Sequence, residues 1–343
     1  MNDWLTAATE EPAVLVTVAI VEGSGPREPG TKMLVTRRGQ YDTIGGGHLE
    51  LLAIEIARGM LYGGATRLQR FALGPTLGQC CGGVMHLVFE HVDAQLTQVL
   101  TQLQQRRNED CWRLSAIDGA GCALLDARGK PVTGVTADMP EHFALDRGTH
   151  VLRDGAGRRW LADPVLAPRA HLLLFGAGHV GAAIVRALAE LPCTVTWIDE
   201  RDDMFPREVP ANVTIEASDL PEALVADAPP GSSYLVMTHS HALDQRLSEA
   251  ILARDDVGWF GLIGSKTKRA QFEHRMRDRG LPAERIATMV CPIGLGGITN
   301  KAPAVIAASV CAQLLTVWEA QRAAAGTHTA RAQPLRLVSS DTF

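Results

Sequence analysis

The sequence predicts an α/β protein with an N-terminal α+β domain, followed by a Rossmann-like domain with a doubly wound parallel sheet. Three observations support this prediction. The chain has 343 residues, and single hydrophobic cores stop growing at roughly 250–300 residues. From residue 171 onward, apolar strands alternate with helical segments, which is the pattern of a parallel sheet. Two prolines within 163–169 resist both helix and central strand and therefore predict a linker.

These observations place the domains at 1–165 and 166–325. The remaining segment, 326–343, is polar and has few large apolar residues, so we expect a disordered tail there, with docking to a partner as the alternative.

Buried strands and glycine-rich turns make up the first domain. The run 13–21 is apolar apart from Thr17 and predicts a buried strand. A helix is predicted at 48–61 from its apolar spacing, and a second at 93–107 with Asp93 as its N-cap. Beyond Ala127 the pattern weakens. The further strands predicted in this domain are 31–36, 84–92, 111–117 and 122–125.

In the second domain each predicted strand is followed by a turn and then, in most cases, by a helix. The predicted strands are 171–175, 194–198, one near Val213, 233–237 and 257–263. The predicted helices run from the glycine loop to Glu190 and over 242–254, 266–279 and 302–322. This alternation predicts the doubly wound sheet.

Composition serves mainly to exclude classes of protein. A net charge of −5 gives no footprint for nucleic acid, whose binders are usually basic. The apolar run 13–21 is far shorter than the ~20 residues of a membrane span. The first residues lack the basic and apolar regions of a signal peptide, and the seven cysteines have no regular spacing. We therefore expect a cytoplasmic protein without a membrane or nucleic-acid partner.

The run 176–181 has the sequence GAGHVG, which is the dinucleotide-binding fingerprint. It follows an apolar strand, opens a helix and precedes Asp199 by 23 residues. Its glycines permit a tight turn and a close approach of pyrophosphate to the helix N-terminus. Asp199 would bind ribose hydroxyls and Arg201 a 2′-phosphate, so NAD(P) is one expected ligand. Another phosphate compound, or none, remains an alternative.

Polar residues after two later strands are further candidates. His239 and His241 follow a strand at the edge of the sheet where α/β proteins bind ligands. With Asp244 they suggest a metal as one reading, a polar ligand-facing edge as a second and helix capping as a third. Lys266 lies near a predicted helix N-terminus, which favours anions.

Two glycine-rich segments near the start of the chain belong to neither pattern. Gly45–Gly47 opens a helix and offers backbone N–H groups to an anion, with Arg27, Lys32 and Arg37 nearby in sequence. Cys80 and Cys81 lie in the second segment, beside Gly82 and Gly83. One reading is that both cysteines are small buried residues. The other is a thiol on an open surface that can meet a soft metal or sulfur ligand.

Taken together, these motifs resemble the XdhC/CoxI family of xanthine dehydrogenase accessory proteins. The resemblance covers the chain from about residue 10 to 322. The motifs that carry it are GSGPR at 23–27, TIGGGHLE at 43–50, LGQCCGG at 77–83, FGAGHVG at 175–181, MTHSHALD at 237–244, GLIGSK at 261–266 and CPIGL at 291–295.

This resemblance implies a chaperone for molybdenum cofactor (molybdopterin) rather than an enzyme. Such proteins hold the cofactor while a cysteine desulfurase supplies its terminal sulfur, and then deliver it to the molybdenum subunit of xanthine dehydrogenase. The sequence leaves a homodimer open. The residues assigned to cofactor binding are Arg27, Gly45, Gly46, Gly47, His48, Cys80, Cys81, Gly82, Gly83, Gly176, Gly178, His179, Gly181, Asp199, His239, His241 and Lys266. No metal ligand and no catalytic residue is assigned.

Two further expectations complete the reading. The Rossmann edge with His179, His239 and His241 is expected to complete the cofactor pocket between the domains. The alternative functions are an NAD(P)-dependent oxidoreductase and a scaffold that docks dehydrogenase to desulfurase without binding cofactor. The sequence contains no Tyr-x-x-x-Lys pair that would support the oxidoreductase.

Overall fold

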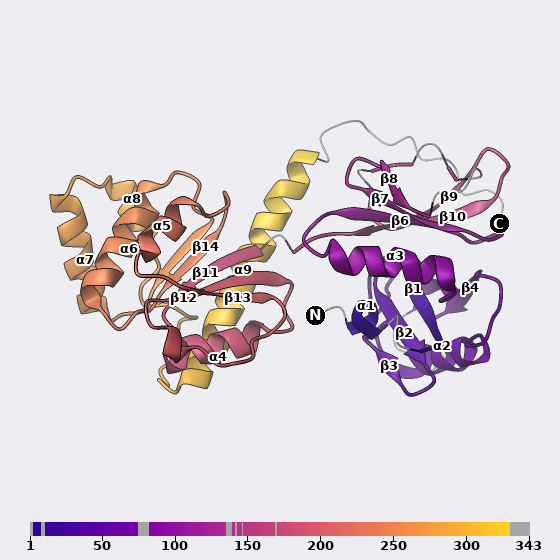
Figure 1. Ribbon diagram of the computed structural model, residues 1–343, viewed down its shortest axis with the longest axis horizontal. Helices are drawn as coiled ribbons and strands as arrows, with labels where there is room; N and C mark the ends of the chain where they lie inside the picture. Colours follow the sequence, from indigo (N-terminus) through magenta and orange to yellow (C-terminus); the bar gives the residue numbers. More distant parts are fainter. Residues whose placement is uncertain are drawn as a thin grey trace. The chain divides into compact units, whose positions relative to one another are not determined.

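The structure is a computed structural model, and it describes residues 3–7, 11–74, 82–134, 139–140, 143–145, 147–168 and 170–329. The chain divides into two compact units, the first ending at Ala167 and the second beginning at Pro168 (Figure 1). The first unit holds antiparallel sheets and the second a parallel sheet with helices on both faces. The α+β and Rossmann-like architecture expected from the sequence is therefore confirmed.

Two antiparallel sheets form most of the first unit among the described residues. Sheet A has the strand order β3-β2-β1-β5-β4, and sheet B has the order β8-β7-β6-β10-β9. The strands of sheet A are β1 (Ala13–Glu22), β2 (Lys32–Thr36), β3 (Gln40–Tyr41), β4 (Arg67–Ala72) and β5 (Val84–His91). Those of sheet B are β6 (Cys111–Ala116), β7 (Cys122–Asp126), β8 (Pro131–Thr133), β9 (His150–Arg153) and β10 (Arg159–Val165).

Strand β1 is buried on both faces because different elements cover its two sides. Val14, Val16 and Val18 pack against helix α2 (Gly47–Gly59). The alternate residues Ala13 and Leu15 pack in a cluster with helices α1 (Asp3–Ala7) and α3 (Ala94–Gln105) and with sheet B. Successive side chains of a strand point to opposite faces, which explains why almost every residue of this strand is apolar.

A buried ionic network joins the two sheets. Arg113 of β6 donates two hydrogen bonds of 2.7 Å to Glu90 of β5, and its other nitrogens contact Asp163 of β10 at 3.2 and 3.3 Å. Lys32 of β2 donates to Asp163 at 3.1 Å. Burial lowers the pKa of Lys32, whereas the carboxylates of Glu90 and Asp163 outweigh burial and raise that of Arg113. Two positive and two negative groups thus balance in a site without water access.

The second unit contains a parallel sheet in the order β13-β12-β11-β14-β15. Its strands are β11 (Ala170–Phe175), β12 (Cys193–Asp199), β13 (Val213–Ala217), β14 (Ser233–Val236) and β15 (Trp259–Leu262). Helices α4 (His179–Leu188) and α9 (Pro303–Thr329) cover one face. The other face is covered by α5 (Pro221–Ala226), α6 (His241–Ala253), α7 (Lys266–Asp278) and α8 (Ala283–Ala287).

By length and composition, α9 is apolar enough to cross a membrane over Pro303–Ala324, with a mean hydropathy of 1.4. Its apolar residues nevertheless form part of the core of the second unit. Ala307, Val310, Cys311, Leu314 and Trp318 are buried in the cluster beneath the sheet. This placement is that of a core helix in a doubly wound fold.

Two boundaries differ from those expected. The segment 163–169 is not a linker throughout, because residues up to Val165 belong to β10. Pro164 is tolerated there because β10 pairs with β9 only over Arg159–Ala162, so that only β6 lies alongside the proline. Helix α9 continues to Thr329, so residues 326–329 of the expected tail are helical, and 330–343 lie outside the described residues.

Candidate functional site

Three segments of the first unit meet beside the N-terminus of α2. The turn between β1 and β2 packs on the loop before α2, since a β-carbon on Gly45 would lie 2.7 Å from Pro26 and 3.3 Å from the side chain of Arg27. The same turn packs on Gly83, where a β-carbon would collide with the backbone oxygens of Glu22 and Ser24. The two early glycine segments are therefore linked through one turn, which the sequence spacing alone does not show.

The carboxylate of Glu50 binds to the glycine loop before α2, which the sequence predicted as an anion site. Its carboxylate accepts hydrogen bonds from the backbone N–H groups of Ile44 and Gly46, each at 3.0 Å, and from the Thr43 hydroxyl and the Gln40 amide. Although burial raises its pKa, these hydrogen bonds outweigh burial and hold the pKa of Glu50 below its usual value. The amides of Ile44 and Gly46 are thus satisfied by the chain itself.

An anion would therefore meet the first turn of α2 rather than the whole loop. No side chain caps this helix in the described part of the chain. Gly47 and His48 are exposed at its start, and a β-carbon on Gly46 would meet open space. Arg27 is exposed beside the loop and can approach an anion, whereas Lys32 cannot, because it is buried against Asp163.

The thiols fall into two groups. Cys80 and Cys81 lie outside the described residues, so their expected role stays a prediction; Gly82, which is exposed, and the buried Gly83 are the described end of this segment. The described cysteines are buried, and burial raises the pKa of each thiol, which is typical of unreactive core residues. These are Cys111, Cys122, Cys193, Cys291 and Cys311.

In the second unit, the glycine loop connects β11 to α4 as the fingerprint predicts. A β-carbon on Gly176 would collide with the backbone of Met237, and one on Gly181 would collide with the backbone oxygen of Gly176. Gly178 differs, since a β-carbon there would meet no atom within 4 Å. Two glycines are therefore needed for packing, while the third leaves space at the helix N-terminus. His179 is exposed on that first turn.

The carboxylate of Asp199 is already bonded within the chain. It accepts the Ala177 N–H at 2.7 Å and the guanidinium of Arg201 at 2.9 and 3.1 Å. Burial raises its pKa, but the bonds from Arg201 and Ala177 outweigh burial and lower it. Asp199 therefore closes the glycine loop from within and neutralises the arginine that was expected to bind a 2′-phosphate.

The polar residues after β14 and β15 form one bonded group. The buried Asp244 accepts hydrogen bonds from the hydroxyl and N–H of Thr238 and from Lys268, whose Nζ lies 2.6 Å away. His239 and His241 are exposed and do not share this carboxylate. Within the described segments, no group of three or more His, Cys, Asp or Glu side chains is arranged to hold a metal. Asp244 instead fixes the loop after β14.

Lys266, at the start of α7, is also exposed, and Ser265 caps that helix by accepting the Lys268 N–H. The lysine that is built into this edge of the sheet is thus Lys268, which the sequence reasoning missed. No local pattern could have indicated the pair, because Asp244 and Lys268 lie on different helices and are 24 residues apart in the sequence.

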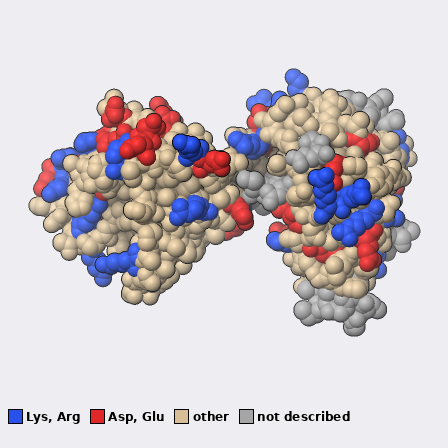
Figure 2. All heavy atoms as spheres, turned by 60° about the horizontal axis from the view of Figure 1, so that its bottom comes forward, with Lys and Arg blue, Asp and Glu red and all other residues tan. Residues whose placement is uncertain are grey.

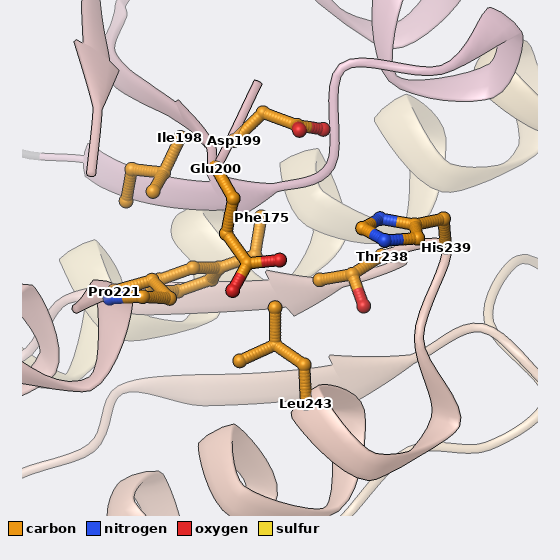
Figure 3. Close-up of a pocket in the computed structure, with 8 residues that line it drawn as sticks. All are labelled: Phe175, Ile198, Asp199, Glu200, Pro221, Thr238, His239 and Leu243. Carbon is orange, nitrogen blue, oxygen red and sulfur yellow. The ribbon is translucent and has the colours of Figure 1, made fainter. Parts of the chain in front are cut away.

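A hollow of about 210 Å³, including the space open to solvent, lies at the carboxyl edge of the parallel sheet (Figure 3). It is lined by residues from β11, β12 and the loop after β14, together with the first residues of α5 and α6. The lining residues are Phe175, Ile198, Asp199, Glu200, Pro221, Thr238, His239 and Leu243. Of the expected site residues, Asp199 and His239 thus share this hollow, and Glu200 is an addition.

The fold defines an α/β protein that combines an N-terminal unit with glycine-rich loops and a Rossmann domain. Two models of known protein families match the chain. A model described as the XdhC and CoxI family matches residues 6–72, and one described as the XdhC Rossmann domain matches residues 172–314. The chain belongs to the XdhC/CoxI family. Membership in this family supports an accessory role associated with xanthine dehydrogenase.

Two individual proteins are similar to the chain. An Escherichia coli K12 protein named uncharacterized protein YqeB is 32% identical over 155 residues, which are 43% of this chain and 27% of that protein. The chain therefore spans about a quarter of that relative. A solved structure described as a xanthine dehydrogenase from Bacillus halodurans has a TM-score of 0.75 at 22% identity, covering 94% of this chain and 97% of that one. This second likeness shows the fold.

Proposed function

We propose that this chain binds molybdenum cofactor (molybdopterin), holds it while a cysteine desulfurase adds the terminal sulfur, and delivers it to the molybdenum subunit of xanthine dehydrogenase. The observation that supports cofactor binding most directly is the meeting of the β1–β2 turn, the loop before α2 and Gly83 beside an uncapped helix N-terminus. Family membership supports the choice of cargo and of recipient.

The described residues fit the phosphate of such a cargo. The first turn of α2 offers N–H groups and the positive end of its dipole, and the exposed Arg27 adds a charge. Figure 2 shows Lys and Arg side chains gathered on one face of the first unit, which favours an anionic ligand. The molybdenum end would meet the thiols of Cys80 and Cys81, which remain predictions.

The test is the cofactor content of the full chain purified from a host that makes molybdopterin. Arg27→Ala removes a charged hydrogen bond and should weaken cofactor retention about tenfold. Arg107→Ala is the matched control, because this exposed arginine lies just beyond α3, on the other side of sheet A from α2. One of Cys80→Ala and Cys81→Ala should also reduce the bound cofactor.

Retention of full cofactor content and dehydrogenase activation by all three variants would contradict the proposed site. A chain that never binds cofactor, yet still supports activation, would favour the scaffold instead. The oxidoreductase alternative rests on the glycine loop of the second unit, and turnover of a carbonyl substrate with NAD(P)H would establish it.

A further inference from the structure

Strand β13 leaves one edge of the parallel sheet open within the second unit. It is the outermost strand of that sheet, and among the described strands only β12 pairs with it (Figure 1). Parallel strands are usually buried on both faces and joined by α-helices. Here the connection from β12 to β13 contains only the 3₁₀ helix Asp202–Met204, and Val213 is the one buried residue of β13. The sheet therefore lacks a covering element at this edge.

The backbone bonds between β12 and β13 show which groups of β13 face outward. Next to the two ends of β13, the Asn212 carbonyl accepts a hydrogen bond from β12 at 2.9 Å, and the Ser218 N–H donates one to β12 at 3.2 Å. Even-numbered residues thus face β12. Because successive residues of a strand alternate in direction, the N–H and C=O groups of Ile215 and Ala217 face away from the sheet. Such a row of backbone groups is a template for another strand.

Two exposed apolar side chains lie at the carboxyl end of the same strand pair. Leu220 follows β13 by three residues and is 71% exposed, and Met204 follows β12 and is 37% exposed. The two strands are parallel neighbours, so their carboxyl ends lie together. Single exposed apolar residues are normal on a protein surface, whereas these two accompany an open strand. They can contact apolar side chains of a segment that pairs with β13.

The surface around this edge is strongly acidic. The segment 199–227 contains nine carboxylates and two arginines, a net charge of −7, although the net charge of the whole chain is −5. Two of these carboxylates, Asp199 and Glu222, are paired with arginines. The exposed carboxylates of the segment that form no ion pair with a described residue are Asp202, Asp203, Glu208, Glu216, Asp219 and Asp227. A surface of this charge attracts a cationic partner and repels an anionic one.

The same charge argues against a second copy of this chain as the occupant of the edge. Charged side chains on an edge strand normally prevent it from pairing with its own kind. Two β13 edges side by side would bring Glu216 and Asp219 of one copy close to those of the other, and like charges across paired strands are destabilising. Lysine or arginine side chains of a different protein would neutralise these carboxylates instead.

We infer that β13 is a docking edge for an extended, lysine- or arginine-rich segment of a partner protein. The segment pairs with Ile215 and Ala217 as a further strand of the sheet, and its cations neutralise Glu216 and Asp219. In this mode of recognition, main-chain hydrogen bonds supply affinity and side chains supply specificity. The edge belongs to a unit other than the one with Arg27, so the inference does not rest on the proposed cofactor role.

The test is fluorescence anisotropy of labelled peptides titrated with the full chain. The peptide KTKVKTK should bind saturably, and its affinity should fall about fivefold between about 50 mM and about 300 mM salt. The anionic peptide ETEVETE should not bind. A form of KTKVKTK with N-methyl groups on alternate amides keeps its charge but loses main-chain donors on one side. This form should bind about tenfold more weakly.

Two pairs of variants separate the main-chain contribution from that of the charges. Ala217→Pro removes one outward N–H and keeps the bonds to β12, because proline is tolerated on an edge strand where its missing N–H faces solvent. It should weaken KTKVKTK binding about fivefold, whereas Ala217→Ser, which keeps the amide, should not. Glu216→Gln should weaken binding about threefold at low salt. Glu284→Gln, at an exposed position on α8, is its matched control.

Several results would overturn the inference. These are a lack of KTKVKTK binding, equal binding of ETEVETE, or an affinity that neither N-methylation nor Ala217→Pro changes. Self-association of the full chain in sedimentation velocity that disappears in Ala217→Pro would identify a second copy as the occupant, and would also overturn it. Molybdopterin content, measured on the same preparations, reports separately on the cofactor proposal.

Discussion

In each unit, one glycine loop is closed by a carboxylate of the chain, but the two closures differ. Glu50 accepts four hydrogen bonds from neutral donors, two of them amides of its own loop. Asp199 accepts one loop amide, from Ala177, and is otherwise paired with the charged Arg201. The first closure binds two loop amides and the second binds one, and both leave the N-terminus of the following helix without a side-chain cap among the described residues.

The difference shows that a glycine-rich segment does not by itself define a ligand site. Backbone N–H groups in a tight loop need acceptors, and a nearby carboxylate can supply them as well as a ligand can. The amides that remain for a ligand are those that the chain has not already bonded. In the first unit these belong to the start of α2, and in the second unit to the start of α4.

The largest expected effect separates the glycines of the second loop that are needed for packing from the one that is not. Gly181→Ala places a methyl group against the backbone oxygen of Gly176 and should destabilise the second unit by about 3 kcal/mol. Gly178→Ala is the matched control and should change stability by less than about 0.5 kcal/mol. Hydrogen exchange measured by mass spectrometry resolves the two units. Equal losses in both variants would contradict the distinction.

The next effect tests the closure of the first loop. Glu50→Ala leaves the Ile44 and Gly46 amides and the Thr43 hydroxyl without their acceptor, and should cost about 2 kcal/mol in the first unit. Glu55→Ala, an exposed position on the same helix, is the control. Chemical unfolding followed by tryptophan fluorescence measures the difference. Similar midpoints for the two variants would mean that Glu50 does not hold the loop.

A smaller effect is expected at the second closure. Asp199→Asn keeps one acceptor for the Ala177 N–H but removes the charge that pairs with Arg201, whose side chain is 38% exposed and can be hydrated instead. The expected cost is about 1 kcal/mol. Asp219→Asn, at an exposed position without such a pair, should be neutral. If Asp199→Asn lowered the unfolding free energy as much as Glu50→Ala does, the two loops would not differ in how strongly their carboxylates hold them.

The smallest effect is a dependence on pH. The folded-state pKa of Glu50 lies below its usual 4.5 because its hydrogen bonds outweigh burial. Its contribution to stability is therefore present above pH 4.5 and is lost as the pH falls through the lower folded value. Unfolding free energies from pH 6 to pH 3 should consequently decline more steeply in the unaltered protein than in Glu50→Gln. If the unfolding free energies of the two proteins declined in parallel with falling pH, Glu50 would have no role in acid sensitivity.

Much of the fold could be predicted because its signals are local. The alternation of apolar strands and helices after residue 171 indicated the parallel sheet, and Asp93 does cap α3 by accepting the Leu96 N–H. The strands β3, β8 and β9 were missed because they are short, β4 because it is an edge strand with mostly polar, exposed residues, and β10 because it contains a proline. Their pairing depends on partners distant in sequence, which local pattern does not reveal.

The candidate sites were less predictable for a related reason. The sequence indicated where glycines and charged residues lie, but not which charged side chains are paired with other groups of the folded chain. Lys32, expected near an anion, is buried against Asp163, and Asp199 is turned to its own loop. Glu200 and Glu50 had no distinguishing pattern, since a single carboxylate acquires its role only from what the folded chain places around it.

The ionic network between the two sheets constrains the order in which the first unit can fold during synthesis. Asp163, in the last strand of that unit, balances Lys32 and Arg113, which are synthesised long before it. Until β10 emerges from the ribosome, closing the two sheets would bury positive charge without its counterpart, at a cost of several kcal/mol. The same lysine also stabilises the turn between β1 and β2, because Lys32 donates a hydrogen bond to the carbonyl of Gly30. We therefore expect a nascent chain that ends before residue 163 to lack a folded turn between β1 and β2, even though the residues of that turn have all been synthesised.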